Sequence, residues 1–133
     1  EDETVFIVVA PSFAATIVLL YSAPLAPFSQ PRNVILGHTI GAVIGCSTNA
    51  IFEHVPELSN HTSVKTGLGV GGSVAIMQAL NVVHPPGAAT AFIASSEEFM
   101  FIISPVLIGA VTLCLLSILL NNVSPQRKYP SYY

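Results

Sequence analysis

Four long stretches of this sequence contain no Asp, Glu, Lys or Arg side chain. Charged residues make up only 8% of the 133 residues, whereas an ordinary soluble domain has about 25%. A helix needs about 20 mostly apolar residues to cross the hydrocarbon core of a bilayer, and each stretch reaches that length. The four stretches are Thr4–Pro31, Asn33–Phe52, Thr66–Ser96 and Phe99–Gln126. The sequence therefore predicts an integral membrane protein whose main partner is the lipid bilayer.

Within these stretches, four segments are apolar and long enough to be membrane helices. They are Thr4–Ser22, Asn33–Phe52, Val64–Val83 and Phe99–Leu120. A shorter apolar segment follows the run His84-Pro85-Pro86-Gly87-Ala88-Ala89-Thr90 and ends at Ser96. We expect one all-α transmembrane domain over residues 1–133, a compact bundle of 4–5 membrane helices with half-helices where proline breaks them. Because Thr66–Ser96 is short for two crossings, either the last element is half-length or the helix before it is shorter than Val64–Val83.

The His84–Thr90 run is unusual inside a stretch that carries no charge. Proline removes a backbone donor and blocks the preceding helical turn. In hydrocarbon each backbone group freed in this way needs another partner, so such a break is tolerated mainly where the backbone is buried in protein or lines a cavity. The run therefore marks a candidate site.

Glycines recur at spacings that favour close helix packing. Gly37, Gly41 and Gly45 are four residues apart, which places them on one helical face. Gly67 and Gly71 have the same spacing on the next predicted helix. In membranes, small residues on one face let another helix approach closely. We expect helix packing rather than cofactor binding at all five positions.

The proline breaks belong to a diverged repeat with an offset of 74 residues. Pro11 matches Pro85, Ala14-Ala15-Thr16 matches Ala88-Ala89-Thr90, and Pro31 matches Pro105. The loop after the first short segment is basic, with Arg32, whereas its equivalent is acidic, with Glu97 and Glu98; after the following long helix the signs reverse. Positive charge prefers the cytoplasmic side of a membrane, so the opposite signs predict an inverted repeat. Inverted repeats with broken helices are typical of transporters.

The remaining composition argues against several classes of function. The net charge of -3 forms no basic stripe, which disfavours nucleic acid as a partner. Cys46 and Cys114 lie in apolar runs and are expected to be small buried side chains. His54 and His61 lie in a polar connector, where a solvated loop is favoured over a metal site. Since no nucleophile and base form a recognisable pair, we expect no enzyme activity, no cofactor and no bound metal.

Four motifs together resemble one known family, in the same order along the chain. They are Pro11-Ser12-Phe13-Ala14-Ala15-Thr16, Gln30-Pro31-Arg32-Asn33 leading to Gly37-His38, Asn81-Val82-Val83-His84-Pro85-Pro86-Gly87-Ala88-Ala89-Thr90, and Asn121-Asn122 followed by Arg127-Lys128-Tyr129-Pro130. This pattern resembles the HPP family of integral membrane proteins, with Ala14 standing where the family has glycine. The resemblance implies a compact bundle of four or five helices. It also implies an additional N-terminal helix, which we expect to be missing from this sequence.

The resemblance also bears on function. Plant and cyanobacterial members of the HPP family are associated with nitrite transport into the plastid or the cell. It therefore implies a small anion such as nitrite as the substrate. The membrane implied is the plastid envelope, the thylakoid membrane or a bacterial inner membrane.

The residue types at the two proline breaks suit anion binding. Proline at a helix start leaves free N–H groups beyond it, and helix N-termini attract anions. We expect Pro11 and Pro86 to be the first residues of two half-helices that face each other near the middle of the membrane. The substrate-binding candidates there are Ser12, Thr16, Pro85, Pro86, Gly87 and Thr90. The hydroxyl groups among them could donate to a small oxyanion.

Three further side chains are candidates for the same site. His84 is an ionisable group inside a predicted span, which suits proton coupling or charge tuning; the alternative is a neutral imidazole bonded to a carbonyl that stabilises the break. His38 has the same two interpretations. Arg32 either attracts anions or binds a carbonyl-rich helix end, or it anchors the topology.

The sequence thus favours a transporter or channel for a small anion, with binding at the paired half-helices. The alternative is a structural or accessory subunit of a larger photosynthetic or respiratory membrane complex. A glycine face on so small a bundle also predicts a homo-oligomer or association with other subunits.

Overall fold

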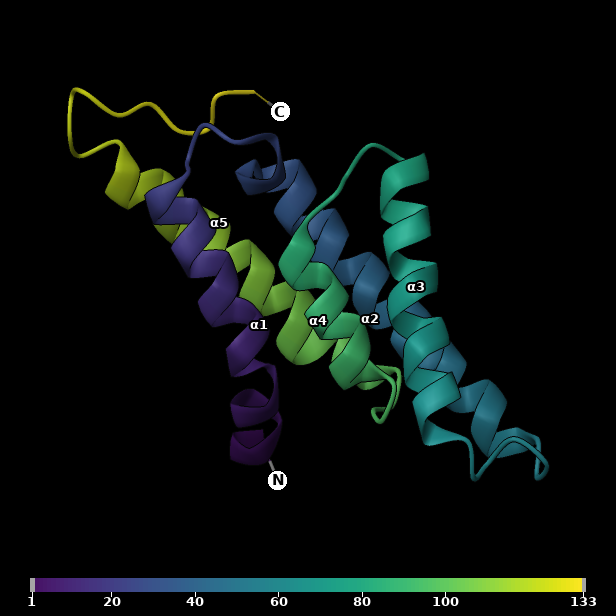
Figure 1. Cartoon of the computed structure of the whole chain (residues 1–133). Helices are drawn as coiled ribbons and strands as arrows, with labels where there is room; N and C mark the ends of the chain where they lie inside the picture. The colour runs from purple at the N-terminus through teal and green to yellow at the C-terminus, as the bar shows by residue number, and fades with distance from the viewer. Residues whose placement is uncertain (1, 133) are drawn as a thin grey trace.

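The computed structural model describes the backbone of residues 2–132 and the side-chain surroundings of residues 11–132 (Figure 1). Over the described residues the chain is all-helical, with five α-helices, two short helical segments and no strand. These elements are α1 (Asp2–Ser22), η1 (Pro27–Ser29), α2 (Pro31–His54), α3 (Thr62–Ala79), α4 (Pro85–Ala94), η2 (Ile102–Leu107) and α5 (Ile108–Asn121). The all-α prediction is confirmed.

In the part of the chain whose side chains are described, two helical stretches are long and apolar enough to cross a membrane. They are α2 with 24 residues and the run Ile102–Asn121 with 20 residues. At a rise of about 1.5 Å per residue, 20 residues span about 30 Å, the thickness of a bilayer's hydrocarbon core. The part of α1 whose side chains are described, Pro11–Ser22, is apolar but shorter.

The region around the His-Pro-Pro run differs from the predicted boundaries. The third helix ends at Ala79 instead of Val83. Asn81 has a positive φ of 58°, which cannot continue a right-handed helix. His84 is extended, at φ -138° and ψ 101°, as the residue before a proline prefers, so α4 begins at Pro85 and not at Pro86. With only 10 residues, α4 is a half-length element.

Proline has opposite consequences at two other positions. Pro11 lies inside α1, so the prediction that it begins a half-helix is wrong. Pro105 lies inside η2, where Ser104 is non-helical at φ -126° and ψ 119°. The predicted helix Phe99–Leu120 is therefore interrupted before α5, because proline lacks the N–H that a helix interior needs.

The glycines of α2 lie against α4. A Cβ atom at Gly41 would overlap the carbonyl oxygen of Gly87, and one at Gly45 would lie 2.6 Å from the carbonyl oxygen of Ala91. At Gly37 it would overlap the Cβ atom of His84. The two helices therefore approach at backbone distance, and this glycine face is covered within the chain.

On α3 the packing positions differ from the prediction. A Cβ atom at Gly67 or Gly71 would have nothing within 4 Å, so neither glycine contacts another helix of this chain. The contacts come from Gly69, 3.0 Å from Thr48 Oγ1, and Gly72, 3.3 Å from Ile44 Cγ2. Gly67 and Gly71 do share one face of α3, as their spacing of four residues predicts, but that face points away from α2.

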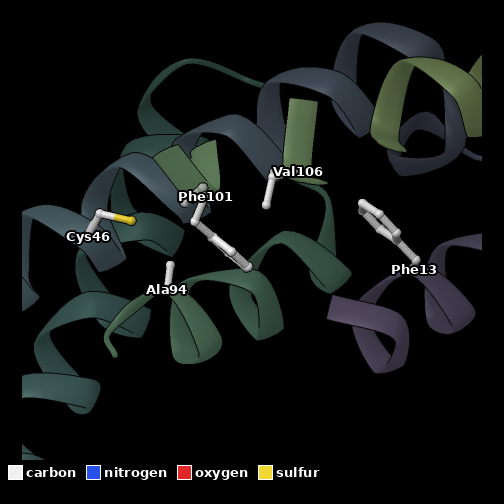
Figure 2. Close-up of a cluster of buried hydrophobic side chains, with 6 residues drawn as sticks. Phe13, Cys46, Ala94, Phe101 and Val106 are labelled. Atoms are coloured by element: carbon white, nitrogen blue, oxygen red, sulfur yellow. The ribbon is translucent and has the colours of Figure 1, made fainter. Parts of the chain in front are cut away.

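An apolar cluster joins α1, α2, α4 and η2 (Figure 2). Its buried members are Phe13, Ala42, Cys46, Ala94, Phe101 and Val106. A second cluster holds α5 against α1 and α2 through Leu20, Val34, Cys114 and Tyr129. Both cysteines are buried and free.

The helices related by the sequence repeat run in opposite directions. In Figure 1, α1 rises from the N-terminus and α4 descends, whereas α2 descends and α5 rises. The start of α2, which carries Arg32, and the tail after α5, which carries Arg127 and Lys128, thus lie at one end of the bundle. The end of α2, which carries Glu53, and the connector after α4, which carries Glu97, lie at the other.

Candidate functional site: a buried histidine–threonine cluster

Five polar side chains meet between α1, α2 and α4. They are Ser12, Thr16, His38, His84 and Thr90, which we call the central cluster, and each has a relative exposure of 0%. A side chain with no accessible surface touches neither solvent nor a water-sized cavity. The cluster is therefore closed in this conformation.

Thr16 and Thr90 bind opposite sides of the His38 ring. The Thr16 hydroxyl oxygen lies 2.8 Å from His38 Nε2, and the Thr90 hydroxyl oxygen lies 2.7 Å from His38 Nδ1. The two threonines are equivalent in the sequence repeat. His38 therefore links the two repeat units through its two nitrogens.

His84 enters the same cluster from the start of α4. Its Nε2 atom lies 3.0 Å from Thr16 Oγ1 and 3.3 Å from His38 Nε2. Its Nδ1 atom lies 2.7 Å from the carbonyl oxygen of Phe28 in η1. The extended backbone that Pro85 imposes places this imidazole beside α2 and not along α4.

Local helical spacing supplies the remaining contacts. Ser12 and Thr16 are four residues apart and share one face of α1. Thr90 can donate to Ser12 Oγ at 3.1 Å or to the Pro86 carbonyl at 3.4 Å. Phe13 meets the His38 ring edge-on, with 5.1 Å between ring centroids. No buried side-chain nitrogen or oxygen in the described part of the chain lacks a hydrogen-bond partner.

A family model for the HPP transmembrane region matches residues 2–130. The chain belongs to the HPP family. A transmembrane protein of Dictyostelium discoideum is 36% identical, over 100% of this chain and 43% of its own length. A second Dictyostelium discoideum transmembrane protein is 38% identical, over 92% of this chain and 44% of its own length. No solved structure matches.

This membership makes the chain an integral membrane protein. The chain spans less than half the length of these curated relatives. The three residues of the His-Pro-Pro triplet have different surroundings in this HPP chain. His84 faces the central cluster, Pro86 is buried, and Pro85 is exposed.

The predicted pair of helix N-termini is corrected by the structure. Only α4 begins at the central cluster, because Pro11 lies inside α1. The Gly87 N–H donates to the His84 carbonyl at 2.9 Å, and α2 covers Gly87 at the Gly37 carbonyl. Side-chain hydroxyls and imidazoles therefore converge here in place of free backbone donors.

Arg32 lies apart from the central cluster. It is exposed at the start of α2, and its Nη2 atom donates to the Leu80 carbonyl at 3.3 Å. Leu80 follows the last residue of α3, so Arg32 binds a carbonyl at a helix end. Gln78 and Asn81, on either side of it, are exposed.

Sequence reasoning missed the Phe28 carbonyl as a member of the site. Phe28 lies in a proline-rich connector, and a backbone carbonyl leaves no signature in a sequence. Asn33, one turn into α2, fixes the neighbouring loop by donating to the Val83 carbonyl at 3.0 Å. Together these contacts hold the extended segment before α4 against the start of α2.

A second cluster of buried polar side chains closes the basic end of the bundle, where α2 starts and the C-terminal tail lies. We call this cluster the tail clasp. It consists of Gln30, Asn121 and Tyr129. Tyr129 donates from its hydroxyl to the Ser29 carbonyl at 2.8 Å, and burial raises its pKa. The Gln30 side chain donates to the Pro24 carbonyl at 2.8 Å and accepts from the Ser131 N–H at 2.8 Å. Asn121 donates to the Leu20 carbonyl at 3.2 Å.

A cavity of about 290 Å³ lies at the acidic end, lined in part by Asn49, Glu53, Glu97 and Glu98. Lys65 donates to Asn49 Oδ1 at 2.7 Å. Burial, with a smaller contribution from Glu98, raises the pKa of Glu97. His54 lines the cavity too, but its Nδ1 atom lies 2.7 Å from the Ala50 carbonyl. No three His, Cys, Asp or Glu side chains among the described residues are placed to hold a metal.

Proposed function

We propose that this chain is the membrane domain of a transporter or channel for a small anion, with nitrite as the candidate substrate. The observation that carries the proposal is the central cluster, with its two histidines and three hydroxyl side chains buried completely between apolar helices. Ionisable residues inside membrane helices are rare, and they typically mark ion or proton pathways. The cluster lies where the two oppositely directed repeat units meet, which is where inverted-repeat transporters bind substrate.

The donors of the central cluster suit a small oxyanion. Hydroxyl and imidazole N–H groups can all donate hydrogen bonds, and no carboxylate contacts them to repel an anion. Binding requires room that the closed conformation lacks. We infer that α1 and α4 separate at the Ser12–Thr90 contact, so that the described conformation is an occluded state.

The substrate and membrane follow from family resemblance. Nitrite, and a location in the plastid envelope, the thylakoid membrane or a bacterial inner membrane, stay predictions, as does the absence of enzyme activity. The two Dictyostelium discoideum relatives are named as transmembrane proteins, and neither name includes a substrate.

Anion uptake into proteoliposomes tests the transport proposal. We expect the purified chain to take up nitrite above the rate of protein-free vesicles, and His84→Ala to reduce that uptake. His61→Ala is the matched control, since His61 is exposed in the α2–α3 connector. No uptake of nitrite, nitrate, formate or chloride by the intact chain contradicts the proposal. Equal uptake by His84→Ala removes only the role of that residue.

A structural subunit is the second candidate, and one observation favours it. The central cluster is closed, and its members hydrogen-bond one another, as expected of a network that only fixes helix positions. Under this proposal the chain packs into a photosynthetic or respiratory membrane complex and carries no solute. Uptake that depends on the central cluster would exclude it.

Any self-association would use a different surface from the one predicted. The glycine face of α2 is covered by α4, whereas Gly67 and Gly71 are exposed on α3. A homo-oligomer stays a proposal, and cross-linking of a Gly67→Cys variant in lipid tests it.

A further inference from the structure

The hydrogen bond to Phe28 determines where His84 carries its proton. A backbone carbonyl can only accept, so the His84 Nδ1 atom, 2.7 Å away, must donate. A neutral imidazole has one N–H, and therefore the Nε2 atom of His84 is an acceptor. It faces Thr16 Oγ1 and His38 Nε2.

This assignment determines the tautomer of His38. If His38 Nε2 were also an acceptor, the Nε2 atoms of the two rings, 3.3 Å apart, would face each other with their lone pairs. The hydroxyl of Thr16 would then have a single proton to donate to two nitrogen atoms. One nitrogen would then lack a donor. With the proton on His38 Nε2, each nitrogen has a partner. His38 Nδ1 then accepts from the Thr90 hydroxyl at 2.7 Å.

The neutral cluster is therefore one oriented chain of hydrogen bonds. Thr90 donates to His38, and His38 donates to Thr16. Thr16 can donate onward to His84, which donates to the Phe28 carbonyl. Every step joins atoms that are 2.7–3.0 Å apart.

His38 Nδ1 is the position at which the chain can accept one more proton with the least rearrangement. Once protonated, it donates to Thr90, whose own hydroxyl then needs another acceptor. Ser12 Oγ at 3.1 Å and the Pro86 carbonyl at 3.4 Å provide one. Protonation of His84 Nε2 would instead turn the Thr16 hydroxyl to the Ser12 carbonyl, 3.0 Å away, and would place two N–H-bearing nitrogens of His84 and His38 only 3.3 Å apart. The cluster therefore accommodates one added proton through the rotation of a single hydroxyl group.

Among the residues whose side chains the structure describes, none that is charged compensates that proton. The described part of α1, from Pro11 to Ser22, has no Asp, Glu, Lys or Arg, and neither does α4. Besides His38, the acids and bases of α2 are Arg32 at its start and Glu53 and His54 at its end, and η1 has none. The nearest titratable neighbour of each imidazole is the other one, with 4.8 Å between ring centroids. An isolated charge buried in this way is strongly disfavoured unless an opposite charge accompanies it.

We propose, on the basis of the transport function above, that the central cluster binds one proton together with one monovalent anion and carries them across the membrane as an electroneutral pair. The proton adds to the lone pair of His38 Nδ1 from the solution on one side and leaves to the solution on the other. No covalent bond to the anion forms, and no group is oxidised or reduced. The anion is the counter-charge that the protein itself lacks.

Nitrite uptake under controlled gradients tests the coupling. Proteoliposomes of the intact chain are compared with protein-free vesicles, with and without an alkaline interior, while potassium and valinomycin set the membrane potential. We expect the pH gradient to increase protein-dependent uptake several-fold, and the potential to leave it unchanged. Uptake that ignores the pH gradient or follows the potential overturns the coupling but leaves anion transport standing. No uptake at all overturns both.

A spectroscopic measurement tests the proton position without transport. In ¹⁵N-histidine-labelled protein with His54→Gln and His61→Gln, only His38 and His84 give ring signals. At neutral pH in lipid nanodiscs we expect Nε2–H on His38 and Nδ1–H on His84. Acidification with nitrite should produce an imidazolium at His38 alone, whereas acidification with impermeant gluconate in place of nitrite should not. An Nδ1–H tautomer of His38, or an imidazolium at His84, overturns the proposal.

A variant pair adds a test at the level of one hydroxyl group. Thr90→Val removes the donor to His38 Nδ1, whereas Thr112→Val removes an exposed hydroxyl that bonds only its own helix at Ile108. We expect the first to abolish the stimulation by the pH gradient and the second to preserve it. If Thr90→Val folds and retains full stimulation, the switching role of Thr90 is excluded.

Discussion

The central cluster and the tail clasp are both buried polar groups, but they are built from different hydrogen bonds. In the central cluster, most of the bonds that join different helices are between side chains, although His84 and Thr16 also bond backbone carbonyls, and two imidazoles can change the positions of their protons. In the tail clasp, side chains mostly bond backbone atoms of loops, as Tyr129 does at Ser29 and Gln30 does at Pro24. A bond to a fixed carbonyl has one direction, whereas a chain of hydroxyls and imidazoles can reverse some of its donors.

This difference suggests a division of roles. The tail clasp ties the C-terminal tail to the α1–α2 connector and closes the basic end of the bundle (Figure 1). In the central cluster, buried polar side chains form contacts between helices that the apolar clusters already hold together. Stability should therefore depend on the clasp, and transport on the central cluster.

The largest expected effect comes from forcing the central cluster open. Gly41→Ala places a methyl group against the backbone of Gly87 and 3.2 Å from the Ala91 nitrogen, where nothing flexible can yield. We expect α4 to lose its position on α2, at a cost of at least about 2 kcal/mol. Thermal unfolding and monodisperse yield in detergent measure it. Gly67→Ala, which meets nothing within 4 Å, is the control. Equal behaviour of the two variants would show that α4 is not packed at backbone distance.

Removing the hydroxyl between the two imidazoles should separate transport from stability. Thr16→Val deletes the bonds to His38, to His84 and to the Ser12 carbonyl of its own helix but preserves the shape of the side chain. We expect nitrite uptake to fall by about tenfold, the equivalent of one lost hydrogen bond of about 1.4 kcal/mol. The melting temperature should change little, because His38 Nε2 still has His84 at 3.3 Å. A large loss of stability with unchanged uptake would reverse the division of roles.

The opposite pattern is expected in the tail clasp. Tyr129→Phe leaves the ring buried but removes the donor to the Ser29 carbonyl. We expect a loss of about 1 kcal/mol in unfolding free energy, with uptake per folded molecule unchanged. Tyr132→Phe is the control, since that side chain is exposed. Reduced uptake without reduced stability would give the clasp a role in transport.

The smallest effect concerns the acidic end and depends on pH. The pKa of Glu97 is raised by burial, so the folded state favours its neutral form. The ionised form is then penalised at neutral pH, and the penalty is absent below the unfolded pKa of about 4.3. We expect Glu97→Gln to melt slightly higher than the parent at pH 7, with the gap closing towards pH 4. Glu57→Gln, in the exposed connector, should show no such trend. A gap that widens on acidification contradicts the sign of the shift.

Much of the fold followed from local chemistry. The charge-free stretches predict membrane helices, and α2 and Ile102–Asn121 have the length and composition to span a bilayer. The start of the half-length α4 follows from His84, because the residue before a proline disfavours the helical conformation. The helix boundaries around it could not be predicted as well, because the positive φ of Asn81 depends on the path of the whole connector.

The candidate site was predicted in its residues but not in its geometry. Ser12, Thr16, His38, His84 and Thr90 were all candidates, yet the expected geometry placed backbone donors from two helix starts beside their hydroxyl groups, and only α4 starts at the cluster. Pro11 looked like Pro85 by sequence, but α1 continues through it, since a proline inside a helix is tolerated where neighbouring helices support it.

The sequence by itself determined that this chain is a helical membrane protein of the HPP type, because charge gaps and proline breaks act locally, through solvation and backbone sterics. Only the tertiary structure decided which polar groups meet. His38 is 46 residues from His84 in the chain, and their contact exists because Gly37 and Gly41 let α4 lie directly on α2. Close packing of backbones brings such distant residues together, and no spacing in the sequence encodes that distance.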